Sequence, residues 1–178
     1  TFSGVIGRTY SLRVESAGRV FEASDRLLPV IPIDSMAYRI DREEEAAPKD
    51  EGRFYQVLLF AMEPRDEKNY YLFKFYRNDT LTFANDTDIY YSDDQLLAEN
   101  IGGLPAPIYF MKNDTARIEA FSISREAFVY YSDLWSLLNN DAGGMFGPIP
   151  SSPRTNLSNG ALGLFQVSAV SARGLKIE

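Results

Sequence analysis

The stretch that decides the fold runs from Phe54 to Tyr76 and reads "FYQVLLFAMEPRDEKNYYLFKFY". Residues 54–62 form a short run that is apolar on both faces, as expected for a strand buried in the middle of a sheet. The polar residues 63–69 turn the chain, and residues 70–76 return as an aromatic-rich strand. This stretch therefore predicts a strand, a turn and a returning strand in a mainly β protein.

Shorter strands are predicted on both sides of this centre. Near the N-terminus Tyr10, Leu12 and Val14 alternate with polar residues, which is the period of a half-buried strand. Residues 20–23 then read as the returning arm of a hairpin. Further strands are predicted at 33–40, 80–83, 88–91, 108–111, 116–123 and 164–170. Many short strands at this spacing favour an antiparallel β-sandwich or a barrel-like domain.

One amphipathic helix is predicted at residues 124–140. Ser124 is a suitable N-cap, and Glu126 places a negative charge in the first turn, where the helix dipole favours it. Apolar residues then recur at spacings of three and four, which defines one stripe: Phe128, Tyr131, Leu134, Trp135 and Leu138. We expect this stripe to pack against a sheet.

The helix is followed by the loop "FGPIPSSPRTNLSNGALG", residues 146–163. A linker is disfavoured because too little chain follows it to form another domain. A phosphate-binding loop is disfavoured because the glycines follow no strand, open no helix and lack the characteristic lysine. Loops of this length inside a compact domain are usually functional or disordered. The prolines reduce the freedom of the unfolded chain, and Asn156, Asn159 and Gly160 provide turn chemistry, so we expect an ordered surface loop.

Composition excludes several classes of function. The 178 residues contain 18 Lys and Arg against 25 Asp and Glu, so the formal net charge is −7 and a nucleic-acid partner is not expected. The absence of His and Cys excludes a Ser-His-Asp triad, a Cys nucleophile and zinc, haem or iron–sulfur ligation by such residues. No run is long and apolar enough to span a bilayer. We expect no cofactor, and carboxylate catalysis, hard-cation binding and recognition stay open.

The sequence resembles a known family. The segments "YYLFKFYRNDTL" and "SISREAFVYYSDLWSLLNNDAGGMFGPIPSSPRTNLSNGALGLFQVSAV", together with "GRTYSLRVE" and "PIDS", are similar to the domain-of-unknown-function 4249 family of Bacteroidetes envelope lipoproteins. The likeness runs along nearly the whole chain, and its most distinctive part is the helix, the Pro-rich loop and the final strand. The resemblance implies no activity, because the family has no established one.

The resemblance implies an organisation and a location. Residues 1–31 are expected to be the terminal hairpin of an immunoglobulin-like N-terminal module, and residues 32–178 a β-sandwich domain that contains the helix 124–140 and the ordered loop 146–163. Family members are exported to the outer membrane and anchored by lipid on an N-terminal Cys, which this sequence lacks. The side of the membrane stays open.

The resemblance also implies a partner. Genes of the family often neighbour those of TonB-dependent outer-membrane receptors, so we expect a non-enzymatic accessory or binding partner of such a receptor. We expect the contact at the start of the loop, at Phe146, Pro148, Ile149 and Pro150. A surface glycan-binding module is the alternative, since the Tyr pairs at 70–71, 90–91 and 130–131 could stack on sugars. In a strand, one ring of such a pair is expected inside and one at the surface.

An acidic segment is the weak candidate for a metal site. Its carboxylates could bind calcium: Asp86, Asp88, Asp93 and Asp94. The EF-hand pattern fails, because Tyr90 stands at the third ligand position and no Gly or final Glu follows in register, so an ordinary acidic loop is favoured. Paired carboxylates could also serve a glycoside hydrolase, a second and less favoured alternative.

Two threonines are candidate O-glycosylation sites. The tripeptides Asp79-Thr80-Leu81 and Asp114-Thr115-Ala116 resemble the Bacteroidetes pattern of an Asp, a hydroxyl residue and a small or apolar residue. Both threonines lie in predicted turns, where modification is sterically easiest. The intact mass of the native protein tests both.

Overall fold

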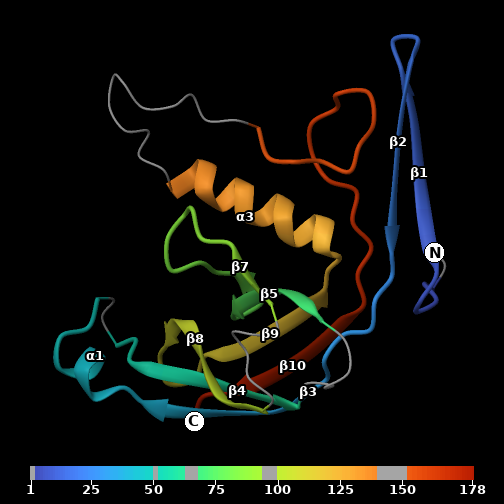
Figure 1. Cartoon of the computed structure of the whole chain (residues 1–178). Coiled ribbons are helices and arrows are strands. Elements are labelled where there is room, and N and C mark those ends of the chain that lie inside the picture. The colour runs from blue at the N-terminus through green and yellow to red at the C-terminus, as the bar shows by residue number, and fades with distance from the viewer. Residues whose placement is uncertain (1–2, 50–51, 63–67, 94–99, 140–151) are drawn as a thin grey trace, which may run out of the picture.

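The computed structural model of the chain describes residues 3–49, 52–62, 68–93, 100–139 and 152–178. Within these residues the protein is mainly β, with antiparallel sheets and one longer helix towards the C-terminus, as the sequence predicts (Figure 1). The strands are β1 (Thr9–Ser16), β2 (Arg19–Arg26), β3 (Ile33–Ile40), β4 (Tyr55–Met62), β5 (Tyr70–Arg77), β6 (Thr80–Leu81), β7 (Tyr90–Asp93), β8 (Asn100–Phe110), β9 (Thr115–Ser122) and β10 (Val170–Lys176). The helices are α1 (Arg42–Ala46) and α3 (Arg125–Asn139).

The two central strands predicted from 54–76 both form, but they belong to different sheets. β4 lies between β3 and β8, whereas β5 lies between β9 and β6 and also pairs with β7. The chain therefore returns on the opposite layer and not beside β4. Each strand gains hydrogen-bonded neighbours in its own sheet and an apolar face towards the other, which is the arrangement of a sandwich rather than a closed barrel.

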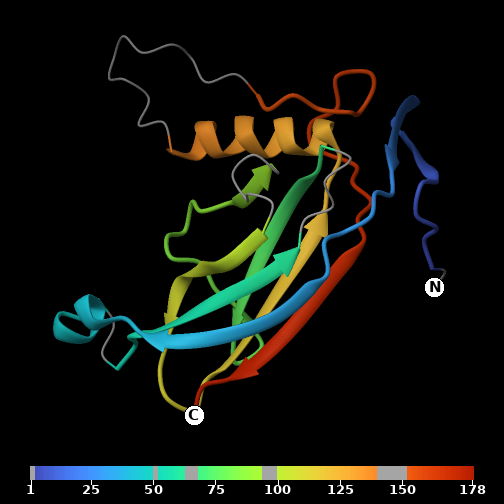
Figure 2. The ribbon, with the colours of Figure 1, turned by 60° about the horizontal axis from the view of Figure 1, so that its bottom comes forward.

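The main core fills the space between these two sheets (Figure 2). Alternation places every second residue of β9 inside, so that Ala116, Ile118 and Ala120 are buried. Val57 and Leu59 of β4 enter the same cluster from the facing sheet. The core thus rests on the period-2 pattern that the sequence displays.

The long helix packs on the outer face of β5 and not between the sheets. Leu72 of β5, Ile123 and Ala127 form a second, smaller cluster there, with the ring of Phe128 4.8 Å from that of Tyr70. β5 is therefore covered on both faces, which explains why Tyr71, Leu72 and Phe73 are buried in succession. The helix boundaries agree with the prediction to one residue, and Ser124 caps it by accepting the N–H of Ala127 at 3.3 Å.

The apolar stripe of α3 is only partly used. Phe128 and Tyr131 pack on the sheet, but Trp135 and Leu138 near the C-terminal end are 43% and 47% exposed. The expectation that the whole stripe packs against a sheet was therefore wrong. The described residues of α3 that pack in the cluster with β5 are Ala127, Phe128 and Tyr131, which lie in the N-terminal half of the helix.

The hairpin β1–β2 stands beside the sandwich as a sheet of its own (Figure 1). Ala17 and Gly18 both have positive φ, 49° and 72°, which suits the tight turn of a right-twisted hairpin. Ser122 on β9 donates its hydroxyl to the carbonyl of Leu28 at 2.7 Å, where the chain leaves the hairpin. The hairpin predicted from the N-terminal alternation is confirmed.

The last strand was predicted at 164–170, and this prediction was wrong: β10 is Val170–Lys176. Alternate N–H groups before it donate to side chains, and the carbonyl of Ala169 accepts the N–H of Ser122 at the end of β9 at 3.0 Å. The N–H groups of Phe165, Val167 and Ala169 donate to Asn156 Oδ1 (3.0 Å), Asp25 Oδ2 (2.9 Å) and Ser122 Oγ (3.0 Å). Because these side chains accept the backbone N–H groups, the three residues do not need the hydrogen bonds that a neighbouring strand would supply.

Candidate functional site

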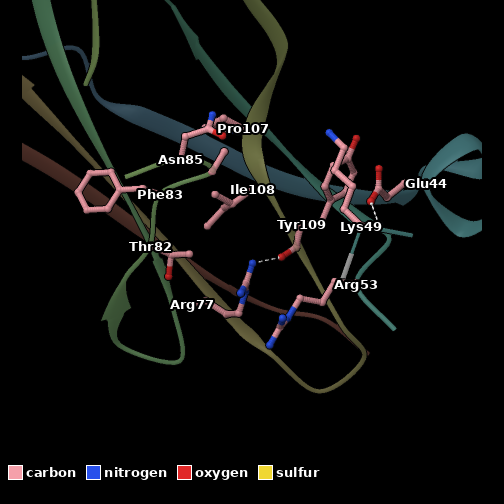
Figure 3. A pocket seen from close by; sticks show the side chains of 11 residues that line it. Glu44, Lys49, Arg53, Arg77, Thr82, Phe83, Asn85, Pro107, Ile108 and Tyr109 are labelled. Atoms are coloured by element: carbon pink, nitrogen blue, oxygen red, sulfur yellow. Dashed lines mark hydrogen bonds between the residues drawn. The ribbon is translucent and has the colours of Figure 1, made fainter. Parts of the chain in front are cut away.

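A polar cavity of about 290 Å³ lies where α1, the end of β5 and the end of β8 meet. We call it the α1–β8 cavity (Figure 3). Its lining combines cations, hydroxyls and one carboxylate over an apolar floor. The lining residues are Glu44, Lys49, Arg53, Arg77, Thr82, Phe83, Ala84, Asn85, Pro107, Ile108 and Tyr109.

One wall of this cavity is the segment 41–53, which the sequence presents as a mixed-charge surface loop. The short helix α1 forms inside it because Asp41 caps the N-terminus, its Oδ1 accepting the N–H groups of Glu43 and Glu44 at 3.1 and 3.2 Å. Tyr109 on β8 donates its hydroxyl to Asp41 Oδ2 at 2.9 Å. This bond fastens α1 to the sheet and places Glu44 at the cavity.

Both partners of that bond have shifted pKa values. The backbone N–H of Glu44, followed by the Tyr109 hydroxyl, holds the pKa of Asp41 below its usual value. Burial, followed by the bond to the Asp41 carboxylate, raises the pKa of Tyr109. The cap therefore stays ionised and the phenol protonated at neutral pH.

A second wall is Arg77, at the end of β5. Its Nη2 donates to the carbonyl oxygen of Tyr109, and its Nε lies 4.0 Å from Asp114 Oδ2. The guanidinium also lies over the ring of Phe110, 5.6 Å from the centroid. Asp114 is itself fixed, since Oδ2 accepts the N–H of Met111 and Oδ1 accepts Nδ2 of Asn78. These contacts hold the guanidinium in one orientation.

The third wall is the segment 82–85 after β6. Tyr90 accepts the N–H of Ala84 at 2.9 Å and donates its hydroxyl to Asp88 Oδ2, also at 2.9 Å. Burial raises the pKa of Tyr90 to about 12. The ring of Phe83 stacks near Tyr90 and points away from the cations of the cavity (Figure 3). The ring of Phe83 is therefore not placed to stack on a ligand bound beside these cations.

A separate surface is built by the loop that follows α3. Near the start of its described part, Arg154 makes a forked pair with Asp133 of α3, with Nε–Oδ2 and Nη2–Oδ1 distances of 2.7 and 2.8 Å. Further on, Ser158 and Glu22 of β2 exchange hydrogen bonds: Ser158 N–H donates to the Glu22 carbonyl, and Glu22 N–H donates to Ser158 Oγ, both at 2.8 Å. Asn159 Nδ2 donates to the Val20 carbonyl at 2.7 Å.

The described part of the loop, 152–163, is therefore fixed at both sides, to α3 and to the hairpin (Figure 1). Asn159 and Gly160 have positive φ, 55° and 71°, and the N–H of Ala161 reaches the Ser158 carbonyl at 3.3 Å, which closes a tight turn. The turn residues identified in the sequence are confirmed at these two positions. Leu162 is 75% exposed at the end of this turn.

The comparisons with known proteins identify the family. The family model described as "Domain of unknown function (DUF4249)" matches residues 1–173. The chain belongs to this family. No curated protein and no solved structure matches the DUF4249 chain. In the parts of it that the structure describes, none of the helices has the length and apolarity needed to cross a membrane.

The proposed contact residues of this DUF4249 chain, Phe146, Pro148, Ile149 and Pro150, lie outside the described residues. The nearest described residues are Asn139 before them and Ser152 after them. Trp135 and Leu138 are the exposed apolar residues before them, and Arg154 fixes the chain after them. The predicted contact surface therefore stays a prediction.

The acidic candidates are not gathered in the described residues. Asp88 Oδ2 accepts hydrogen bonds from the backbone N–H of Asn85 and the hydroxyl of Tyr90. Asp93 forms an ion pair with Lys68 at 3.5 Å. Asp86 is exposed, and Asp94 lies outside the described residues. Among the residues that are described, no group of three or more potential metal-ligating side chains occurs.

The two candidate glycosylation sites lie at one corner of the β5–β9 sheet. The prediction that both threonines lie in turns was wrong, because Thr80 begins β6 and Thr115 begins β9, each directly after a turn. Thr80 is exposed, and the preceding Asp79 side chain is 90% exposed. Thr115 is also exposed, but its preceding Asp114 is buried beside Arg77. An enzyme that reads the Asp side chain of the folded protein therefore reaches it at Thr80 and not at Thr115.

The tyrosine pairs do not present the expected surface rings. Tyr71 is buried, and Tyr70, Tyr90, Tyr91, Tyr130 and Tyr131 are all half-buried. The expectation that one ring of each strand pair is exposed was wrong. The cause is α3, whose Phe128 contacts both Tyr70 and Tyr91 on the face that would otherwise be solvent.

Sequence reasoning missed the residues of the α1–β8 cavity. Arg53, Arg77 and Tyr109 come from three segments that only the fold brings together. No motif spacing connects them. The one available signal is the concentration of charge in residues 41–53, a pattern that is also typical of a solvated surface loop.

Proposed function

We propose that this chain is a non-enzymatic binding protein of the bacterial cell envelope that accompanies a TonB-dependent outer-membrane receptor. In this proposal it is a Bacteroidetes lipoprotein, held at the outer membrane by a lipid anchor on a segment preceding the sequence. The loop that follows α3 forms the contact surface, with Phe146, Pro148, Ile149 and Pro150 at its centre.

The observation that carries the proposal concerns the described part of the loop, which is fixed by hydrogen bonds to α3 and β2 and has an exposed apolar residue. Arg154 ties it to α3, Ser158 and Asn159 tie it to β2, and Leu162 is exposed. Trp135 and Leu138 on α3 add exposed apolar area on the approach to the loop. A surface ordered before binding loses little entropy when a partner docks, which favours a recognition role.

The residue inventory supports binding over catalysis. The chain has no His and no Cys, and the described residues that line the α1–β8 cavity include a single carboxylate, Glu44. Hydrolysis of a glycosidic bond by the usual route requires two carboxyl groups facing each other across the bond. The cavity is therefore better suited to holding a ligand than to cleaving one.

A pull-down of the native complex from gently solubilised membranes tests the receptor partnership. We expect the tagged wild-type protein to recover a TonB-dependent receptor, and the Ile149→Ser, Pro150→Ser double variant to recover much less. Met62→Ser is the matched control, because Met62 is an exposed apolar residue of β4, 68% exposed, outside the loop and α3. Equal recovery with both variants would count against this surface.

A surface glycan-binding module is the second candidate, favoured by the hydroxyl, amide and cationic groups that line the α1–β8 cavity. Such groups bind sugar hydroxyls and acidic substituents. A glycan array with the purified protein separates the two functions, since a receptor partner need not retain sugar alone.

A further inference from the structure

We infer that the α1–β8 cavity binds the oxyanion of a small molecule, a carboxylate or a phosphate. This ligand site goes beyond the receptor partnership and does not depend on it, because the cavity is formed within one chain. It lies at α1 and β8, whereas the proposed contact surface follows α3 (Figure 1).

The first argument is the local reversal of charge. The whole chain carries a formal charge of −7, yet among the described residues that line the cavity three are cations and one is a carboxylate. The cations are Lys49, Arg53 and Arg77, and they come from two separate segments of the chain. A concave surface that gathers one sign of charge raises the local concentration of ions of the opposite sign.

The second argument is that the acidic groups around the cavity already accept hydrogen bonds. Glu44 Oε1 accepts the backbone N–H of Lys49 at 2.7 Å, a bond drawn in Figure 3. Asp41 accepts two N–H groups of α1 and the hydroxyl of Tyr109. Asp114 accepts donors from Met111 and Asn78. These carboxylates are thus partly compensated by neutral donors as well as by the cations.

The third argument is that one guanidinium is preorganised. Arg77 is held by the Tyr109 carbonyl on one side and the Phe110 ring on the other. The Asp114 carboxylate also lies beside it, with 4.0 Å between Asp114 Oδ2 and Arg77 Nε. A guanidinium has five N–H donors in a fixed fork, so it can bind a carboxylate or a phosphate while it keeps these contacts. Figure 3 shows Arg53 and Arg77 both at the lower side of the cavity in that view.

The size and floor of the cavity define the ligand. Its volume of about 290 Å³ is at the lower end for ligand sites, which are typically roughly 300–1,000 Å³, so a compact molecule fits and a long chain does not. Ile108 in the floor is buried, 3% exposed, and an apolar floor strengthens the attraction between a bound anion and the cations.

Isothermal titration calorimetry of the purified chain tests this site with three probes: inorganic phosphate, glucuronate and uncharged glucose. We expect at least one of the two anions to bind saturably and glucose not to bind. Arg53→Gln should weaken the binding by about tenfold or more, as expected for the loss of a charge-assisted hydrogen bond. Lys49→Gln, at an exposed position, should weaken it less and leave the fold intact.

Arg173→Gln is the matched control, because Arg173 is an exposed cation on β10, away from the cavity lining. Its anion affinity should equal that of the wild type. The inference is overturned if neither anion binds, if glucose binds as well as the anions, or if Arg53→Gln and Lys49→Gln, both shown to be folded by circular dichroism, bind like the wild type. None of these results bears on the receptor pull-down, so the two proposals can fail separately.

Discussion

At the scale of the residue, the contact that governs the described part of the loop is the pair Asp133–Arg154. The forked bonds, together with the backbone N–H of Arg154 at 2.9 Å, lower the pKa of Asp133 to about 2. A depressed carboxyl pKa stabilises the folded state only where the carboxyl is ionised. The contribution is therefore fully present above the ordinary value of 3.8 and is lost as the pH falls through about 2.

Replacing the carboxylate tests this pair. Asp133→Asn should lower the free energy of unfolding at pH 5, and the difference from the wild type should shrink steadily as the pH falls from 4 towards 2. The effect should be small, because Arg154 is 72% exposed and water screens the pair. Denaturant unfolding at several pH values measures it, and a difference that stays constant with pH would exclude the ion pair as its source.

Single residues also show what the sequence can and cannot reveal. Asn159 and Gly160 were predicted as turn residues from local chemistry alone, and they take positive φ. The partners of Arg77 could not be predicted, because Tyr109 is far along the chain and joins it only when β5 and β8 are in place. The backbone conformation of a turn residue can be predicted from its own chemistry, whereas a hydrogen bond between distant residues depends on the completed fold.

At the scale of the element, the side chain of Asn156 makes the hydrogen bonds that a neighbouring strand would make to the segment before β10. Asn156 accepts the N–H of Phe165 at 3.0 Å and donates to its carbonyl at 2.7 Å, as a neighbouring strand would. The same amide lies 3.4 Å from the carbonyl of Ser24 on β2. One side chain thus joins both sides of the loop to the hairpin.

Removal of this amide should loosen the loop. We expect Asn156→Ala to cost about 1–2 kcal/mol of unfolding free energy, because it leaves the partly buried N–H and C=O of Phe165 without their partner. Hydrogen exchange of the Phe165 amide should become faster. Ser152→Ala, at an exposed position of the same loop, should leave both quantities unchanged.

Elements with strong periodicity were the ones that the sequence predicted well. The range 33–40 agrees fully with β3, and α3 differs from its prediction by one residue at each end. The segment 164–170 alternates equally well, but the strand begins only at Val170. Alternation reports which face of a segment is buried, and it does not report whether a strand or a set of side chains supplies the hydrogen bonds.

At the scale of the whole molecule, two facing sheets form the core, α3 covers one outer face, and the loop joins α3 to the hairpin (Figures 1 and 2). The sequence predicts the antiparallel β architecture, because the alternation expected of half-buried strands recurs along the chain and burial follows it clearly in β4 and β9. It did not predict that β4 and β5 lie in different sheets. That division depends on which strands pair at long range, and no local pattern encodes it.

The central claim is that the loop after α3 is a ready-made contact surface for an envelope receptor. Hydrogen exchange of the chain alone and in its native membrane complex tests it most directly. We predict slow exchange in the described part of the loop already in the free protein, with further protection of residues 135–163 in the complex. Fast exchange there in the free protein, or protection confined to residues outside this range, would contradict the claim.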